Sequence, residues 1–527
     1  MASVIRRRYL GGAAAALGGL LAAACGEIEV RYVQGPAGPA GPAGAQGERG
    51  ATGAAGAKGA AGAAGQTQTI VQEKVVTVEK PVVVEKPVVV ERVVTVEKVV
   101  QKPAERIAPK KLEFWAVDYA DGSSLNYGRK ALHDNVRRWN EQSDDTFVSL
   151  NPRPSGPHME KLIASYAAGT QPQLTMWPSW HAGLFAIAGI LVDVQDRFIK
   201  ADRNFAAQLD DFYEPVLQSM YFRGKLFSLE IAPNADLPYT NLNLVREAGL
   251  EPLELGYTWD DLADYCVTMQ GALGPGRESN KWAIAHMRNA AVFANLFKQA
   301  GGEMYNGDYT KVGYNSPEGL DAAQFIHDLH HKYQVHRPHG DYFKESGKPT
   351  SDFRKGEIGM YYETSRFRIL TFAEAIGGME NMYVSPPPSR KEPFVISFGR
   401  GVQMVKNPPD IEDAAWEVHK FMVAADQAAH YSAIEYFLPN RRSSRETAEY
   451  QAALENAPPF KVFLEALDNY SFRPSHPAYF DHYRATAALL NDIGTTPNLN
   501  IKDAVAETAR QLDLLLETFN REQADKL

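Results

Sequence analysis

Aromatic and acidic residues stand where two strands are expected to end. Residues 112–117 and 173–177 are apolar runs typical of strands; Asp118 and Tyr119 follow the first, and Trp177 and Trp180 end the second. An aromatic face packs against the C–H patches of a polyhydroxylated molecule, and a carboxylate accepts hydrogen bonds from its hydroxyls. These residues predict a binding site for a small polar solute. Core packing of the tryptophans and loop capping by Asp118 are the alternatives.

The elements around these residues alternate between strand and helix. A helical pattern reaches Trp139 and Asn140, a strand follows at residues 147–150, and a second helix precedes the strand at residues 173–177. Such alternation predicts a parallel sheet, in which the loops at the carboxyl ends of the strands face the ligand.

No set of residues favours catalysis. The chain has no phosphate-binding glycine loop and no nucleophile elbow. A glycoside hydrolase, with two carboxylates flanking a sugar, is the enzyme alternative, but no such pair stands out. His327 and His331 have the spacing of two metal ligands within a histidine-rich run that extends to His339. They lie opposite the apolar face of their helix, so we expect a solvated face, no metal and no cofactor.

Composition bounds the class of protein. The chain has 527 residues, 44% of them hydrophobic, and a net charge of −9. That length supports a large core and more than one domain, and the charge argues against nucleic-acid binding. Cys25 and Cys266 are the two cysteines, so no structural disulfide is expected.

Residues 1–24 are typical of an export signal. The basic residues 6–8 precede an apolar run, residues 11–24, that is shorter than the ~20 residues of a membrane-spanning helix. The arginine pair resembles a twin-arginine signal, with a simple basic leader as the alternative. Cys25 follows a sequence similar to a bacterial lipobox. We expect it to carry a lipid that tethers residues 25–34, and the chain beyond, to the outer face of the cell membrane.

Two repeats follow the anchor. Glycine occupies every third position from Gly35 to Gly65, so residues 35–67 predict either a collagen-like homotrimer or a flexible spacer. Within residues 70–109, a glutamate followed by a basic residue recurs every six positions from Glu73 to Glu97. Because six is a multiple of the strand period, an extended chain would place all the glutamates on one face. Self-association of stalks and a solvated linker are both open.

Residues 224–241 divide the remaining body, residues 110–527. Pro233 and Pro238 cannot donate to a sheet ladder, so we expect an irregular crossing between two lobes rather than a central strand throughout.

The ordered motifs of this body resemble family-1 extracellular solute-binding proteins of ABC importers, the group that mostly serves sugars. The motifs include G-T-Q-P-Q-L-T-M-W at residues 169–177, G-K-L-F at 224–227, L-P-Y-T-N at 237–241, E-A-G-L at 247–250 and Y-T-W-D-D-L at 257–262. Further matches run from residue 300 to residue 439. Departures occur at Gln173, Ser228, Glu230 and Pro238, and they bear on the ligand more than on the fold.

The resemblance implies an α/β fold of two lobes joined by hinge crossings, the type II periplasmic-binding-protein-like fold. Lobe 1 would comprise residues 111–232 and 394–436, and lobe 2 residues 237–384 and 438–527. The implied protein is no enzyme: it binds a small polar solute, a sugar or else an acidic ligand, and delivers it to an ABC permease. A surface adhesion protein on an oligomeric stalk is the alternative function.

Further ligand-binding candidates follow from this arrangement. The segment at residues 360–366 ends a strand where the family often places a stacking aromatic, and Arg366 falls near that position. Arg400, within F-G-R-G at residues 398–401, is a second arginine candidate. An arginine there could clamp a carboxylate, a phosphate or vicinal hydroxyls, or it could pair with a local carboxylate. The crossing itself supplies polar groups, and a third crossing is expected beside Leu438. The candidates are Tyr362, Glu363, Arg366, Arg400, Asn234, Asp236 and Tyr436.

Overall fold

The computed structural model describes residues 109–118, 127–285, 287, 290–338, 348–364, 368–469, 471–472, 476 and 478–523. The predicted export signal, Cys25, both repeats, Tyr119 and Arg366 lie outside the described residues. The chain divides into two compact units, residues 1–98 and 99–527, and the described residues belong to the second. Within them, no helix combines the length and apolar character needed to cross a bilayer.

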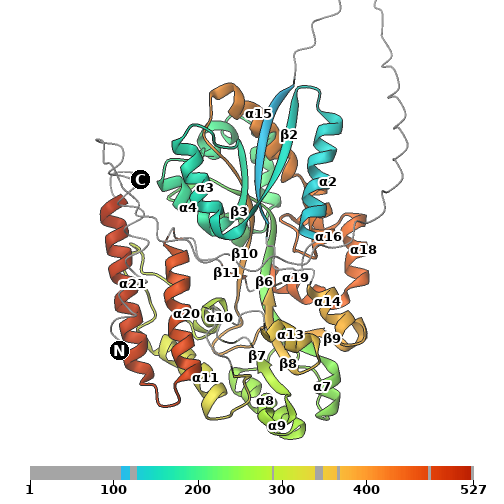
Figure 1. The fold of residues 1–527 in the computed structure, drawn as a ribbon, viewed down its shortest axis with the longest axis vertical. Helices are drawn as coiled ribbons and strands as arrows, with labels where there is room; N and C mark the ends of the chain where they lie inside the picture. Colours follow the sequence, from blue (N-terminus) through green and yellow to red (C-terminus); the bar gives the residue numbers. More distant parts are fainter. Residues whose placement is uncertain are drawn as a thin grey trace, which may run out of the picture. The chain divides into compact units, whose positions relative to one another are not determined.

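One mixed sheet runs through the described body in the order β2-β1-β3-β10-β6-β8-β7 (Figure 1). Its strands are β1 (Lys110–Asp118), β2 (Thr146–Pro154), β3 (Leu174–Pro178), β6 (Leu229–Asn241), β7 (Trp282–Ala285), β8 (Ile358–Thr364) and β10 (Val395–Met404). Two short strands, β9 (Met382–Val384) and β11 (Ser471–Phe472), pair with β6 and β10. A separate hairpin joins β4 (Tyr221–Phe222) to β5 (Lys225–Leu226). β1 is parallel to β2 and β3, which confirms the predicted parallel strands.

Helices cover both ends of this sheet. We call the part built on β1–β3 the first lobe; it carries α2 (Tyr127–Gln142), α3 (Ser155–Ala167), α4 (Ala182–Ile187), α15 (Pro409–Met422) and α16 (Ala425–Glu435). The second lobe is built on β7–β9; it carries α7 (Leu242–Glu247), α8 (Trp259–Leu273), α10 (Ala290–Gln299), α11 (Pro317–His331), α13 (Lys348–Arg354), α14 (Arg368–Ala375), α20 (Tyr479–Thr495) and α21 (Ile501–Gln523). Among the shorter elements are η1 (Ser179–His181), α5 (Arg203–Ala207), α6 (Glu214–Met220), α18 (Ala448–Asn456) and α19 (Lys461–Asn469).

Strand β6 is continuous, contrary to the expected irregular crossing. It exchanges partners along its length: residues up to Ala235 pair with β10, and residues from Asp236 pair with β8. At Pro233 and at Pro238 the ladder involves one neighbour rather than two among the described strands, so each missing N–H removes little pairing. Pro233 lies opposite Gly399, where an added Cβ would come within 2.6 Å of a backbone oxygen. The prolines are therefore compatible with a strand that passes from one lobe to the other.

The family-like T-W-D-D segment has a structural role. Thr258 caps α8: its Oγ1 accepts from the Asp261 N–H at 3.1 Å, and the Asp261 carboxylate accepts from the Thr258 N–H at 2.8 Å. This reciprocal capping box satisfies two helix-terminal donors. The Thr258 hydroxyl also donates to the Asp261 carboxylate at 2.7 Å, and this bond, together with the one from the Thr258 N–H, lowers the pKa of Asp261. Trp259 is buried and donates to Gln299 Oε1 at 2.8 Å. In α21, Val505, Leu512 and Leu516 are buried.

The histidine-rich helix α11 is packed, so the predicted solvated face is wrong. His327 Nε2 lies 3.1 Å from the Pro497 carbonyl, and His331 Nε2 lies 2.8 Å from the Ile493 carbonyl. Carbonyls at the end of α20 lack helical partners, and the imidazoles satisfy them. No group of three or more potential metal-ligating side chains comes together anywhere in the described part of the chain.

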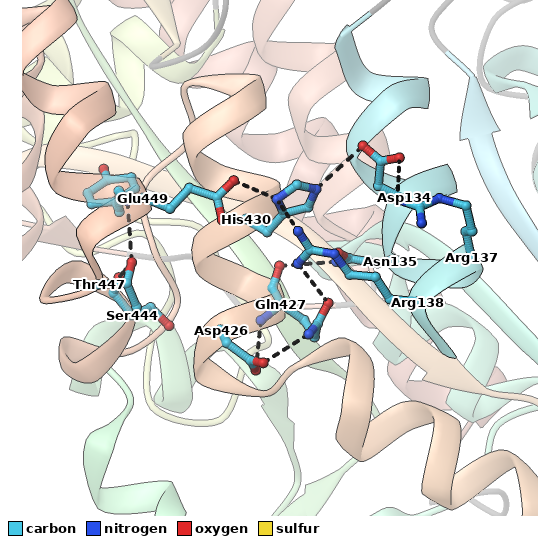
Figure 2. A network of polar contacts seen from close by, with 11 residues as sticks. Asp134, Asn135, Arg137, Arg138, Asp426, Gln427, His430, Ser444, Thr447 and Glu449 are labelled. Carbon is cyan, nitrogen blue, oxygen red and sulfur yellow. Dashed lines mark hydrogen bonds and ion pairs between the residues drawn. The ribbon is translucent and has the colours of Figure 1, made fainter. Parts of the chain in front are cut away.

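A polar network ties α2 and α16 of the first lobe to α18 (Figure 2). His430 Nδ1 lies 2.6 Å from Glu449 Oε1 and 3.0 Å from Arg138 Nη2, while its Nε2 lies 3.5 Å from Asp134 Oδ2. Asn135 donates to the Gln427 carbonyl at 3.0 Å. This network holds helices together and has no group in common with the site described next.

Candidate functional site

Three segments that join the lobes lie together. They are β6, β10 and the turn after α16, where Leu438 N donates to the Pro233 carbonyl at 3.1 Å. Arg400 of β10 pairs with Ala232 of β6 on one side and with Pro178 of β3 on the other. Tyr436 occupies the left-handed region with φ 54°, which ends α16 and turns the chain toward Leu438. These three segments lie together between the two lobes and connect them.

Buried rings of the first lobe lie beside these connecting segments. His158 stacks on Trp177 with centroids 4.5 Å apart, and His181 meets the same indole edge-on at 5.3 Å. Trp115 meets His158 edge-on at 6.4 Å, and the Arg153 guanidinium lies 4.3 Å from the Trp115 ring. We call Trp115, His158, Trp177 and His181 the first-lobe ring cluster.

The first-lobe ring cluster is uncharged at neutral pH. Burial lowers the pKa of His158 to about 4, assisted by the charge of Arg153, and burial lowers the pKa of His181 to about 3. His158 Nε2 lies 2.9 Å from Thr175 Oγ1. Trp177 Nε1 has no hydrogen-bond partner among the described residues, although the atom is buried. A buried donor of this kind has bonding capacity that a solute hydroxyl could satisfy.

A buried acid stands next to the third crossing. Glu435 is 1% exposed, and burial raises the pKa of its carboxyl to about 8 while the Arg400 charge opposes that rise. The Arg400 guanidinium lies 5.2 Å from the Phe437 ring centroid. Glu230 is also fully buried, with one carboxylate oxygen beside Gly399. The Arg400 guanidinium thus lies near the Phe437 ring and acts electrostatically on the Glu435 carboxyl.

A second set of rings lines the other lobe. Tyr305 Oη lies 2.8 Å from His482 Nδ1, and the Tyr305 ring lies 5.3 Å from the ring of His476. Tyr309 stacks on His476 at 5.3 Å with an interplanar angle of 24°, and Phe519 meets His476 edge-on. Burial lowers the pKa of His476 to about 4 and that of His482 to about 3. We call these five residues the second-lobe ring cluster.

Electrostatic and packing contacts bring both clusters to the crossing. Helix α20 of the second lobe packs against η1, which contains His181. Arg223, in the hairpin of β4 and β5, helps to lower the pKa of His476. At the start of α20, burial raises the pKa of Tyr479, and the negative charge of Asp236 on β6 adds to that rise. Rings from each lobe therefore lie near the strands that join them.

The predicted site residues that the structure describes fall into three groups. Trp177, Asn234, Asp236, Arg400 and Tyr436 lie on or beside the crossing; Asn234 Oδ1 is buried and has no partner among the described residues. Tyr362 instead lies in the second-lobe core, where burial and the nearby Cys266 raise its pKa. For Asp118, Trp180 and Glu363 the backbone is placed: they lie at the end of β1, in η1 and in β8.

Sequence reasoning missed the histidines of both clusters, together with Tyr305, Tyr309 and Glu435. His181 directly follows the predicted Trp177–Trp180 loop, so its position was a usable signal. The second-lobe ring cluster joins residues near positions 305, 476 and 519, which no local pattern connects.

A separate hollow lies on the first lobe. It has a volume of about 580 Å³ and is lined by Arg197, Lys420 and neighbouring residues. Two of the cations that line it pair with carboxylates: Lys420 with Asp202 at 3.2 Å, and Arg197 with Asp413 at 3.0 Å.

Comparison with known proteins decides the family. Residues 122–429 match the bacterial extracellular solute-binding protein family, which is more than half of the chain. The chain belongs to this family. Among curated relatives, the sn-glycerol-3-phosphate-binding periplasmic protein UgpB of Pectobacterium atrosepticum is 25% identical over 240 residues, which cover 44% of this chain and 51% of the relative. The chain thus spans about half the length of the curated relatives it matches.

Solved structures share the fold. The cyclic alpha-maltosyl-1,6-maltose binding protein of Arthrobacter globiformis has a TM-score of 0.65 at 21% identity, covering 78% of this chain and 100% of that chain. The sugar-binding protein MalE of Xanthomonas citri has a TM-score of 0.67 at 17% identity over 78% and 98% of the two chains. UgpB of Mycobacterium tuberculosis in complex with glycerophosphocholine has a TM-score of 0.62 at 18% identity over 77% and 98%. The type II two-lobed fold is therefore confirmed, and the family and these neighbours are binding proteins, not enzymes.

Proposed function

We propose that this family member is the lipid-anchored, extracytoplasmic solute receptor of an ABC importer. It binds a carbohydrate or a related small polar solute between its two lobes and delivers it to a membrane permease. Binding shifts the equilibrium between open and closed arrangements of the lobes, because the solute contacts both lobes when they close.

The observation that carries this proposal is the pair of ring clusters beside the crossing. Each lobe contributes neutral aromatic and imidazole rings, and the crossing strands contribute the polar side chains of Asn234 and Asp236. Apolar ring faces with a few convergent polar groups are the usual composition of a site for polyhydroxylated ligands. The neutral histidines and the engaged Arg400 favour an uncharged sugar.

A glycerol phosphate is the second candidate solute. The curated relatives are sn-glycerol-3-phosphate-binding proteins, and Arg400 is a cation on the crossing itself. An arginine in that position can bind a phosphate with two parallel hydrogen bonds.

The test is a thermal-shift and calorimetric screen of the full chain. The ligands are maltose, maltotriose, sn-glycerol-3-phosphate, glycerophosphocholine and inorganic phosphate. We expect a sugar to raise the melting temperature, with Arg400→Met weakening sugar binding less than phosphate binding. If none of these solutes changes the melting temperature, a solute receptor for sugars or glycerol phosphates is excluded.

The anchor and stalk form a separate part of the proposal. Cys25 would carry the lipid, and residues 35–67 and 70–109 would hold the binding body away from the membrane. Metabolic labelling with a palmitate analogue should mark the wild type but not Cys25→Ser. Native mass spectrometry of the chain from residue 26 onward should show a trimer if the glycine repeat forms a triple helix. A monomer would indicate that the repeat is a flexible spacer and would remove support for the adhesion alternative.

A further inference from the structure

Tyr309 combines exposure with a fixed, unfavourable backbone conformation. Its side chain is 40% exposed, and its φ of 55° lies in the left-handed region that a tyrosine rarely adopts. Hydrogen bonds hold the turn: Tyr309 N donates to the Asn306 carbonyl at 3.0 Å, Thr310 N donates to Asn306 Oδ1 at 2.9 Å, and Asn520 Nδ2 donates to the Tyr309 carbonyl at 2.9 Å. The surrounding residues thus hold the backbone at Tyr309 in one conformation at the surface.

Other rings support Tyr309 from behind. The nearly parallel stack on His476 is completed by Tyr305, whose ring lies 5.6 Å from that of Tyr309. His476 Nδ1 accepts from the Ala478 N–H at 3.0 Å, and the lowered pKa keeps this imidazole neutral. One ring face of Tyr309 is therefore backed by uncharged rings, and the exposed part of the ring faces solvent.

The rings continue from Tyr309 to the crossing. Tyr305 contacts His482, and Tyr479 lies 5.9 Å from His482 by ring centroids. Helix α20, which carries both Tyr479 and His482, packs against η1, the short helix that directly follows β3. Tyr309 is therefore the surface end of a run of rings that reaches the helix in contact with η1.

Phe147 provides a contrast. It is 47% exposed at the start of β2, yet it makes no ring contact with any described residue. Exposure of a single aromatic side chain is ordinary on a protein surface. Phe147 lacks the features that distinguish Tyr309, which are the hydrogen-bonded turn, the stacked ring behind it and the run of rings that reaches α20.

We propose that Tyr309 forms an outer subsite on the second lobe, which stacks one pyranose ring of an oligosaccharide whose other end is held between the lobes. Aromatic faces pack on the C–H patches of a sugar ring. This inference rests on the proposed function, since it needs a sugar in the cleft, and it adds that the solute is an oligosaccharide extending out of the cleft.

The test measures how affinity depends on chain length, by calorimetry on the full chain with maltose, maltotriose and maltotetraose. Tyr309→Asn removes the ring but tolerates the left-handed backbone, Tyr309→Phe keeps the ring, and Phe147→Ala is the matched control. We expect Tyr309→Asn to weaken binding of the longest sugar about three- to tenfold and of maltose little. Tyr309→Phe and Phe147→Ala should match the wild type.

Equal weakening for all sugar lengths, or none, in a folded Tyr309→Asn protein would overturn the outer subsite. So would a wild type that binds glycerol phosphate but none of these sugars, which leaves the proposed receptor function intact. A wild type that binds no sugar and no phosphate compound overturns both.

Discussion

Both ring clusters combine aromatic side chains with buried histidines, but they differ in exposure. In the first-lobe ring cluster, Trp115, Trp177, His158 and His181 are all at most 7% exposed. In the second-lobe ring cluster, the histidines are equally buried, but Tyr309 is 40% exposed. The first cluster is therefore part of a packed wall with fixed shape, whereas the second has a face open to solvent. In a receptor that closes on its solute, the buried rings of the first cluster can fix the orientation of the solute. The exposed Tyr309 ring can contact solutes of different length.

The largest expected effect of a single substitution contrasts Trp177→Ala with Tyr309→Ala. Removing the buried indole leaves a cavity against His158 and His181, so we expect a loss of about 3–5 kcal/mol in the free energy of unfolding. Tyr309→Ala should change it by less than about 1 kcal/mol. Urea unfolding monitored by circular dichroism measures both. Losses of similar size would show that the two clusters contribute equally to packing.

Acid should destabilise both clusters in the same direction. The pKa values of His158, His181, His476 and His482 are lowered to about 3 or 4 by burial. In the unfolded chain these imidazoles take up protons below about pH 6.5, but in the folded chain they do not until about pH 4. The free energy of unfolding should therefore fall as pH drops through this window, by about 1.4 kcal/mol per pH unit for each histidine.

Single variants separate the two lobes in this acid limb. His158→Gln and His476→Gln should each reduce the slope of stability against pH between pH 6 and 4.5, measured by urea unfolding at each pH. An unchanged slope in either variant would mean that its histidine is already protonated in the folded chain.

Glu435 should give the opposite trend at higher pH. Its folded pKa of about 8 lies above the ordinary value for glutamate, so the folded chain keeps a proton that the unfolded chain has released. Stability should fall as pH rises, and above about pH 6.5 the buried histidines are neutral in both states. We expect a loss of about 2 kcal/mol between pH 6.5 and 8, and a flatter profile in Glu435→Gln. If the stability of Glu435→Gln falls with rising pH as steeply as that of the wild type, a group other than Glu435 causes the loss of stability at alkaline pH.

The sequence predicted the elements better than the site. The strands before Asp118 and Trp177 were recognisable because short apolar runs alternate with helical patterns, and Thr258 with Asp261 signals its own helix start. We did not predict that β6 is continuous. Proline is disfavoured only in strands that are paired on both sides, and the local sequence does not show with which strands a segment pairs. Tyr362 was assigned to the cleft, but it lies in the second-lobe core. Adjacent residues of a strand point to opposite faces, and the sequence did not show which face of this strand is buried.

The smallest expected effect concerns the polar network of α2, α16 and α18, which serves as a control for both clusters. Glu449 is 46% exposed at its side chain and contacts His430 at 2.6 Å (Figure 2). Partly exposed ion pairs contribute at most about 1 kcal/mol, because solvent screens them and side-chain entropy opposes them. Glu449→Gln should therefore change the free energy of unfolding by less than about 1 kcal/mol and leave solute affinity unchanged. A change in affinity would mean that α16, which ends at Glu435 and is followed by Tyr436, transmits this contact to the crossing. The contrast between the two ring clusters would then depend on the helices that pack behind the first lobe.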